Sequence, residues 1–108
     1  MYSKRYKPTA AQKRFWDELA QGGCVNCGRP AEIHHILGAA AKQNKVHIGQ
    51  WAVVPVCPDH HRVWEKVGKL TQMEDYIAEV LNPYWRRFGE VPMSKDELLA
   101  LVTWSKAA

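Results

Sequence analysis

The stretch 24–65 constrains the fold of this chain most, because it holds all three cysteines and all five histidines. It contains two pairs with the same spacing, Cys24-x2-Cys27 and Cys57-x2-His60. Thiolate and imidazole ligands spaced in this way suit the tetrahedral geometry of a closed, structural zinc site. We therefore expect these four side chains to bind one structural zinc ion.

Other interpretations of the cysteines are weaker. Ordinary buried cysteines have no reason to repeat one spacing. A disulfide would use two of the three cysteines and leave one thiol unpaired. No signal peptide precedes the cysteines, which indicates a reducing, cytoplasmic location. One ambiguity stays open here, because spacing alone cannot decide whether His60 or the adjacent His61 is the fourth ligand.

Four further residues remain once the zinc ligands are assigned: His34, His35, His61 and Glu65. His61 and Glu65 are four positions apart, so on a helix that begins near Pro58 they share one face and suit a single divalent ion. His34 or His35 would reach that face from a preceding strand. Any one of these residues alone would be an ordinary polar side chain, but together they predict a second metal site beside the zinc.

The motif order Cys-x2-Cys, His-His, hydrophobic strand, Cys-x2-His-His resembles the HNH endonucleases, which have the ββα-metal (His-Me finger) fold. The amino-acid sequences of residues 31–36 and 51–61 are similar to those of small phage and prophage members, including the Ref-type recombination nucleases. The resemblance covers about residues 22–68. It implies a metal-dependent hydrolase of DNA phosphodiester bonds, encoded by a phage or prophage.

The resemblance also implies a role for each matching residue. His35 would be the general base, and His34, His61 and Glu65 would hold the catalytic ion. The zinc ligands would be Cys24, Cys27, Cys57 and His60. One position departs from the family pattern, because the chain has Gln50 where the middle Asn normally precedes the second strand, and Asn44 lies further upstream.

The chemistry of phosphodiester hydrolysis agrees with these roles. A neutral imidazole, with an ordinary pKa of about 6.5, can take a proton from water near neutral pH. A site with two histidines and one carboxylate should tolerate Mg, Mn or Ni as the catalytic ion. Neighbours on an ideal strand point to opposite faces, so His34 and His35 serve one site only if the strand ends, bulges or twists near Gly38.

Composition is compatible with a nucleic-acid partner. The net charge of +4 favours a polyanion such as DNA, and Lys42, Lys45, Arg86 and Arg87 are candidate phosphate contacts. Three cations and two tyrosines in residues 1–8 could also follow a phosphate backbone. No apolar run is long enough for a membrane span. A chain of 108 residues is small for a specific nuclease, so a homodimer or a recombination or phage protein is a candidate partner.

The expected fold is one α+β domain over residues 1–108, with a zinc-stabilised ββα-metal motif at about 22–68 and a helical extension over about 69–108. One helix, opened by a capping box of Thr9 and Gln12, precedes the motif. Two helices follow it. The predicted strands cover 33–37 and 51–56, joined by a loop over 38–50 that includes a helical turn at 39–41.

In the extension, apolar residues at helical spacing predict a helix with a Thr71 cap and Gln72 on its polar side, interrupted at Asn82-Pro83. Trp85 and Phe88 are expected to pack inward. A capping box of Ser94 and Glu97 predicts a last helix to about Lys106.

A second function hypothesis is a zinc-stabilised nucleic-acid-binding or protein-interaction module that has lost catalysis. The His-His pair with His61 and Glu65 favours the nuclease, since a binding module does not need these residues. The missing Asn and the modest charge favour the module. A second divalent ion, beyond the zinc, would distinguish the two.

Overall fold

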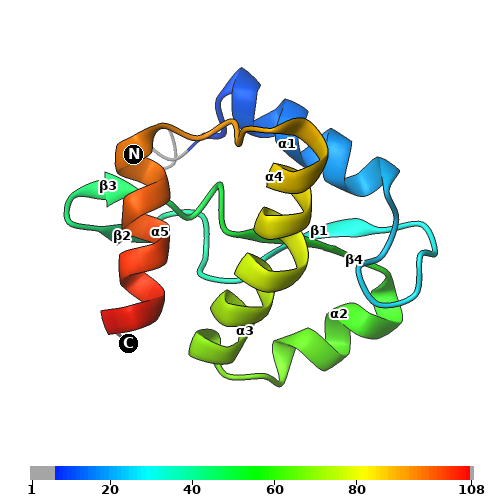
Figure 1. Cartoon of the computed structure of the whole chain (residues 1–108). Coiled ribbons are helices and arrows are strands. Elements are labelled where there is room, and N and C mark those ends of the chain that lie inside the picture. Colours follow the sequence, from blue (N-terminus) through cyan, green and yellow to red (C-terminus); the bar gives the residue numbers. More distant parts are fainter. Residues whose placement is uncertain (1–6, 108) are drawn as a thin grey trace.

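The computed structural model describes residues 7–107, and Figure 1 shows how the elements are arranged. Most of the expected contacts of the segment 1–8 lie outside the described residues. In chain order the elements are α1 (Ala10–Gln21), β1 (Glu32–His35), β2 (Lys42–Gln43), β3 (Val46–His47), β4 (Val53–Val56), α2 (Pro58–Glu65), α3 (Lys69–Tyr76), the π-helical segment η2 (Ile77–Leu81), α4 (Asn82–Phe88) and α5 (Lys95–Ala107).

Helix α1 begins and ends where its sequence predicts. The Thr9 side chain accepts a hydrogen bond from the Gln12 backbone N–H at 3.1 Å, and the Thr9 backbone N–H donates to Gln12 Oε1 at 2.8 Å. This capping box satisfies N–H groups that the first turn leaves without helical partners. The helix ends at Gly22, and Phe15 is fully buried on its inner face.

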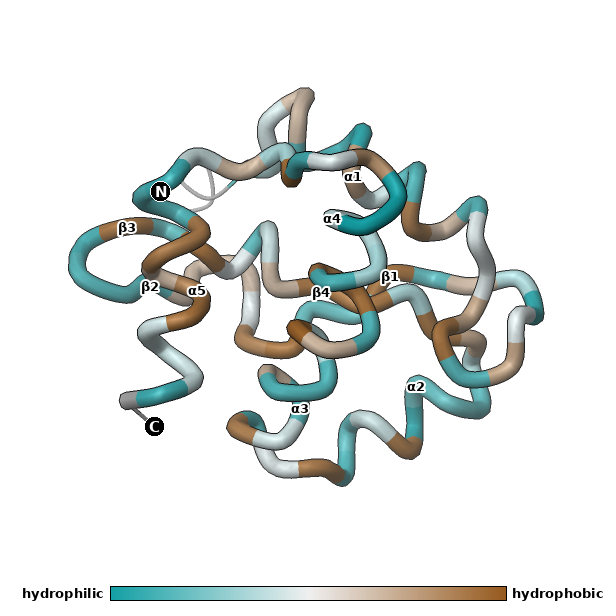
Figure 2. The backbone as a smooth tube through the Cα atoms, in the orientation of Figure 1, coloured by the Kyte–Doolittle hydropathy of each residue, from teal (hydrophilic) through white to brown (hydrophobic). Residues whose placement is uncertain are grey.

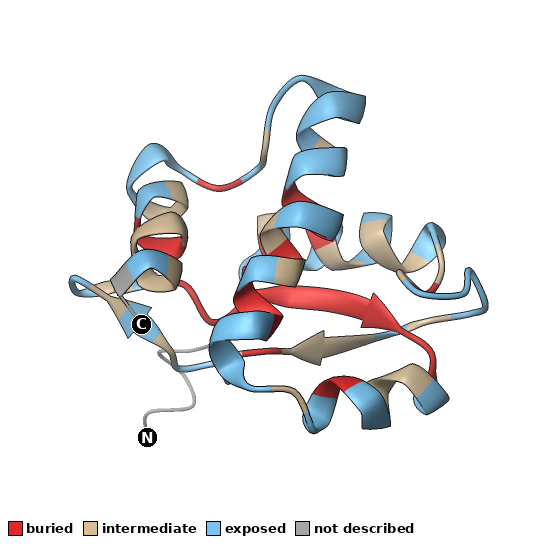
Figure 3. Ribbon diagram, turned by 60° about the horizontal axis from the view of Figure 1, so that its bottom comes forward, coloured by how far each residue is buried: buried red, intermediate tan, exposed pale blue. Residues whose placement is uncertain are grey.

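Strands β1 and β4 form an antiparallel two-stranded sheet that carries the candidate site residues. Glu32 pairs with Val56, and His35 pairs with Val53. Both strands are shorter than the sequence predicts, and every residue of β4 is buried. Figure 3 shows β4 in red, with helices packed around it. Strand β1 ends at His35, so the regular alternation of side chains between the two faces stops at this residue.

The sequence predicts a loop over 38–50, but this segment is more ordered in the structure. It contains a second antiparallel sheet, β2–β3, in which Lys42 pairs with His47. Asn44 and Lys45 turn the chain with φ of 53° and 66°. Two consecutive positive φ angles match the tight hairpin turn whose twist suits the flanking strands, and Asn-Gly is its usual sequence. The helical turn expected at 39–41 is a hydrogen-bonded turn only.

The helical extension is continuous where an interruption was expected. Helices α3 and α4 are joined through η2 without a break (Figure 1), and Pro83 lies in the first turn of α4. Proline cannot donate a backbone hydrogen bond, and its ring clashes with the carbonyl four residues earlier. The wider π-helical turn of η2 removes that clash, so the helix continues past the proline.

Other details of the extension also differ from the predictions. Helix α3 is capped by Gly68, not by Thr71, and Gln72 is buried at 5% exposure instead of facing solvent. Trp85 and Phe88 remain exposed at 52% and 45%. Both lie on α4, which has no buried residue, whereas the preceding turns of the same long helix bury Tyr76, Val80 and Leu81.

Helix α5 begins with the predicted capping box, since the Ser94 N–H donates to Glu97 Oε1 and the Glu97 N–H donates to Ser94 Oγ. The other Glu97 oxygen accepts a hydrogen bond from Trp51 Nε1 at 2.6 Å, which fixes α5 against the loop before β4. Apolar residues concentrate along β4 and alternate with polar ones along the helices (Figure 2). Within the described residues, no helix combines the length and apolar character needed to cross a membrane.

Candidate metal centre and histidine cluster

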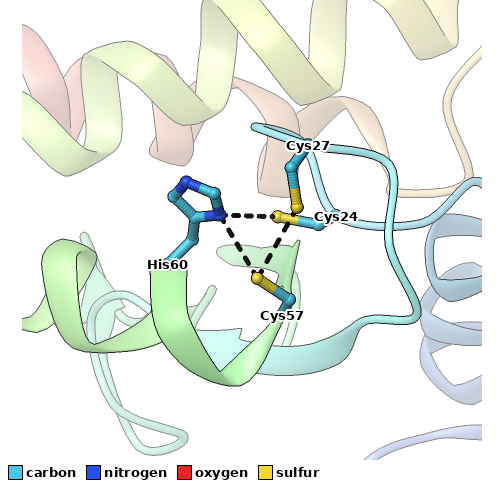
Figure 4. A group of neighbouring side chains, drawn as sticks. All are labelled: Cys24, Cys27, Cys57 and His60. Atoms are coloured by element: carbon cyan, nitrogen blue, oxygen red, sulfur yellow. Dashed lines mark hydrogen bonds between the residues drawn. The ribbon is translucent and has the colours of Figure 1, made fainter.

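The two Cys-x2 pairs of the sequence meet at the end of the β1–β4 sheet. Figure 4 shows Cys24 and Cys27 on the turn after α1, facing Cys57 and His60 at the start of α2. The Sγ atoms of Cys27 and Cys57 are 3.7 Å apart, and His60 Nδ1 lies 3.2 Å from Cys57 Sγ and 3.6 Å from Cys24 Sγ. The structure thus groups His60, and not His61, with the three cysteines.

These distances fit a tetrahedral zinc ion. With Zn–S bonds of about 2.3 Å and Zn–N bonds of about 2.1 Å, a tetrahedron separates two sulfurs by about 3.8 Å and a sulfur from a nitrogen by about 3.6 Å. All four ligand atoms lie within 4.8 Å of one another, and no other group among residues 7–107 reaches that spacing. The donor chemistry and the distances therefore both suit a metal such as zinc.

Local structure holds the four ligands in place. The turn is closed by the Gly28 N–H, which donates to the Cys24 carbonyl at 2.8 Å, and the Asn26 N–H points to Cys24 Sγ at 3.4 Å. On the other side, Asn26 Oδ1 accepts a hydrogen bond from Trp64 Nε1 at 2.9 Å. Helix α2 is thereby fixed to the cysteine turn, so ordering one pair of ligands also orders the other.

A guanidinium group lies beside the thiolates. Arg29 Nε is 3.4 Å from Cys27 Sγ, and its Nη2 is 3.8 Å from Cys57 Sγ and 3.4 Å from Asp59 Oδ2. Hydrogen bonds from Arg29 lower the pKa of the Cys27 thiol to about 6. Three thiolates and a neutral histidine around a divalent ion carry one net negative charge, and Arg29 is placed to balance it.

We expect Arg29→Met to weaken zinc binding by about tenfold, because partners beyond the ligands commonly contribute 10- to 100-fold to metal affinity. Competition with a chromophoric zinc chelator measures the change. The control is Arg62→Met, which removes a different exposed arginine, one that lies on α2. This variant should leave the zinc affinity unchanged. Equal affinities in the two variants would contradict the role of Arg29.

A second cluster lies across β1 and α2, centred on His61. Its Nδ1 is 2.6 Å from Glu32 Oε1, and its Nε2 is 3.2 Å from Glu65 Oε1. A neutral imidazole has one N–H, which the shorter contact assigns to Nδ1 and Glu32. The lone pair on Nε2 then faces a carboxylate oxygen, so that contact needs a proton or a metal cation between its two atoms.

His34 lies beside this pair. Its ring centre is 4.6 Å from that of His61, and its Nε2 is 3.1 Å from Gln72 Oε1. Burial lowers the pKa of His34, although the hydrogen bond with Gln72 acts in the opposite direction. The neutral ring is the form of histidine that binds metal ions. His34, His61 and Glu65 do not converge as closely as the cysteine cluster does.

His35 contacts a different part of the molecule. Its Nε2 is 2.8 Å from Gln50 Oε1, and its ring meets the Trp16 ring edge-on, with centres 5.2 Å apart. His34 therefore faces α2 and α3, while His35 faces α1. A substrate that touches both histidines has to lie across the end of β1.

The four candidate phosphate contacts do not form one patch with these histidines. Lys42 and Lys45 are exposed on the β2–β3 hairpin, which packs beside α5. Arg86 and Arg87 are exposed on α4, and the Arg87 guanidinium lies 5.0 Å from the centre of the Phe88 ring.

Sequence reasoning missed Glu32 and the contact roles of two glutamines. Glu32 is two residues before His34, and residues two apart on a strand share a face, so this signal was present in the sequence. Gln50 was noted only as an amide near the position of the missing Asn. Gln72 gave no signal, because its position on α3 matches a solvent-facing residue.

Comparisons with known proteins give the family. The sequence model of one family, described as "Recombination enhancement, RecA-dependent nuclease", matches residues 8–106. No curated protein and no solved structure matched the chain. The match extends from α1 through α5 and includes both clusters. This chain therefore belongs to the RecA-dependent nuclease family of recombination enhancement.

Proposed function

We propose that the protein is a metal-dependent HNH endonuclease, encoded by a phage or prophage, that hydrolyses DNA phosphodiester bonds. The observation that carries the proposal is the position of His34 on β1 beside His61, which contacts Glu65 on α2, with His35 next to it at the end of the same strand. The order of β1, β4 and α2 is that of a ββα-metal motif. Membership of a nuclease family supports the same conclusion.

In this proposal zinc has a structural role. The cluster of Cys24, Cys27, Cys57 and His60 uses four protein ligands, which leaves no open position for a substrate. It connects the turn after α1 to the start of α2, and a two-stranded sheet such as β1–β4 is marginal without such support. The zinc thus holds α2, and with it His61 and Glu65, against β1.

His35 supplies the general base. Its imidazole accepts a proton from a water molecule as the water oxygen bonds to phosphorus and the bond from phosphorus to the leaving oxygen breaks. The proton stays on His35, and the leaving alkoxide takes a proton from solvent. The partial exposure of His34 and His35 allows a backbone phosphate to reach them.

A divalent ion, such as Mg, Mn or Ni, would be held by His34, His61 and Glu65 and would supply charge neutralisation at the phosphate oxygens. The donor set fits such an ion. Octahedral ligands about 2.1 Å from a metal are about 3.0 Å apart, close to the 3.2 Å between His61 Nε2 and Glu65 Oε1. Glu32 would keep the proton on His61 Nδ1, so that Nε2 faces the ion.

DNA delivery would depend on a partner. The family description names RecA dependence, so we propose that a RecA-type recombinase bound to DNA presents the substrate. Lys42 and Lys45 on the β2–β3 hairpin and Arg86 and Arg87 on α4 would contact phosphates away from the histidines. A second copy of the chain is the other candidate partner for extending so small a surface.

The test is cleavage of DNA by the zinc-loaded protein, with and without RecA filaments, in Mg, Mn or Ni. We expect cleavage only when a divalent ion is added, and strongest when the filament is present. A parallel titration of manganese should find a second ion bound in addition to zinc.

Absence of cleavage under every condition, together with one zinc and no second ion, would overturn the nuclease proposal. DNA binding under those conditions would support the other hypothesis, a zinc-stabilised binding module without catalysis. A variant with Glu65→Gln checks the ion itself, because it should weaken the manganese site and leave the zinc in place.

A further inference from the structure

Two buried glutamines each face one of the adjacent histidines. Gln50, exposed by 9%, directs Oε1 to His35 Nε2 at 2.8 Å, and Gln72, exposed by 5%, directs Oε1 to His34 Nε2 at 3.1 Å. Gln12 is the other buried charged or polar residue in the described chain, and its amide closes the capping box of α1. Burying an amide costs free energy unless its hydrogen bonds are made. The two contacts with the histidines therefore help to satisfy these buried side chains.

The amide of Gln72 can have only one orientation. Its Nε2 donates to the Val67 carbonyl at 2.6 Å, and a carbonyl oxygen cannot donate in return. The Oε1 atom is therefore the one that faces His34. Because Oε1 only accepts hydrogen bonds, the facing Nε2 atom of His34 carries the hydrogen, and the lone pair of the neutral ring is on Nδ1.

The contact of His35 has the same atoms. Gln50 Oε1 lies 2.8 Å from His35 Nε2, and an amide oxygen only accepts, so with this placement of the amide Nε2 of His35 is the donor. The backbone carbonyl of Gln50 accepts from Trp16 Nε1 at 2.8 Å, which holds the Gln50 backbone beside α1. The Trp16 ring in turn contacts the edge of the His35 imidazole. Trp16, Gln50 and His35 thus fix one another, and the free lone pair of His35 is on Nδ1.

We propose that Gln50 and Gln72 are positioning residues that hold both histidines with hydrogen on Nε2 and a lone pair on Nδ1. Under the proposed nuclease function, on which this inference rests, Nδ1 of His35 would receive the proton from water, and Nδ1 of His34 would be the atom of that ring able to hold a divalent ion. The missing middle Asn is replaced by two amides from separate elements, the loop before β4 and helix α3. Neither amide touches the reacting atoms.

The first readout is independent of cleavage. Long-range ¹H–¹⁵N NMR of the zinc-loaded protein distinguishes which ring nitrogen of each imidazole carries the hydrogen, and pH 8 is chosen because it lies above the ordinary titration range of histidine. His34→Ala and His35→Ala spectra assign the signals. We expect both residues to carry hydrogen on Nε2 in the parent chain. Gln50→Met should alter the pattern of His35 alone, and Gln72→Met that of His34 alone.

The second readout is kinetic. We expect Gln50→Met to lower kcat about 10- to 100-fold with little change in KM, because it disturbs the base and not DNA binding. Gln50→Glu keeps an acceptor oxygen and should restore most of the rate. Gln21→Met, the same change at the exposed end of α1, is the control. Zinc content and helicity show that each variant is folded.

Each outcome bears on the proposal. Hydrogen on Nδ1 of His35 or His34 in the parent, or unchanged histidine patterns in the Met variants, would overturn it even if the parent cleaves DNA. A Gln50→Glu variant as slow as Gln50→Met would also overturn it. If the NMR patterns are as expected and the parent cleaves nothing, the nuclease function fails and the positioning of the rings stands.

Discussion

Cys57→Ala should abolish zinc binding and unfold most of the domain. Structural zinc contributes about 10–16 kcal/mol of apparent binding free energy in small zinc-dependent folds, and that energy is also folding energy. A domain of this size is stable by only about 5–15 kcal/mol. Cys57 lies between β4 and α2, at 3% exposure, so losing its thiolate also releases α2 from the cysteine turn. Zinc content and far-ultraviolet circular dichroism measure the two effects.

The adjacent histidines supply a matched control. His60→Ala should resemble Cys57→Ala, since His60 Nδ1 lies in the cluster. His61→Ala should retain zinc and helicity, because its contacts are with Glu32 and Glu65. Chelation of zinc from the parent chain should reproduce the loss of structure seen in Cys57→Ala. A Cys57→Ala protein that stays folded and keeps its zinc would remove the structural role assigned to the cluster.

His35→Ala should lower the rate of DNA cleavage by about 10²- to 10⁴-fold, the usual contribution of a positioned general base. Zinc content, helicity and DNA binding should not change. The His35 ring contacts Trp16 and Gln50, and neither belongs to the zinc cluster. Single-turnover cleavage of a labelled DNA at saturating protein measures the chemical step directly.

His47→Ala is the control for this prediction. His47 is an exposed histidine on β3, away from the β1–β4 sheet, and its removal should leave the cleavage rate near that of the parent. If His35→Ala cleaves as fast as His47→Ala, His35 is not the base. His34→Ala should also be slow, but its loss should be partly recovered at high concentrations of the added divalent ion.

Local signals in the sequence predicted several features well. The capping boxes at Thr9 and Ser94 depend on residues three apart, and both form. The four candidate zinc ligands come together because two short spacings fix each pair within one turn of backbone. The α+β character and the pairing of two strands before a helix were also evident, because β-branched residues dominate the second strand.

Non-local packing decided what these signals missed. The β2–β3 hairpin uses Asn44 and Lys45 in a turn that usually contains glycine, so its sequence looked like a loop. Helix α4 continues past Pro83 because η2 widens the preceding turn. Trp85 stays exposed although it is aromatic, since it lies on α4, the part of the long helix that buries no residue.

The sequence by itself determined which residues can bind metal and accept protons, because ligand chemistry and short spacings belong to the residues themselves. It left the choice between His60 and His61 open, and it assigned no hydrogen-bond role to Glu32, Gln50 or Gln72. Only the tertiary structure decided these, by placing Gln72 of α3 against His34, Gln50 of the loop before β4 against His35, and Glu32 of β1 against His61. The physical reason is that a hydrogen bond depends on contact within about 3 Å, and these partners are 15 to 38 residues apart along the chain.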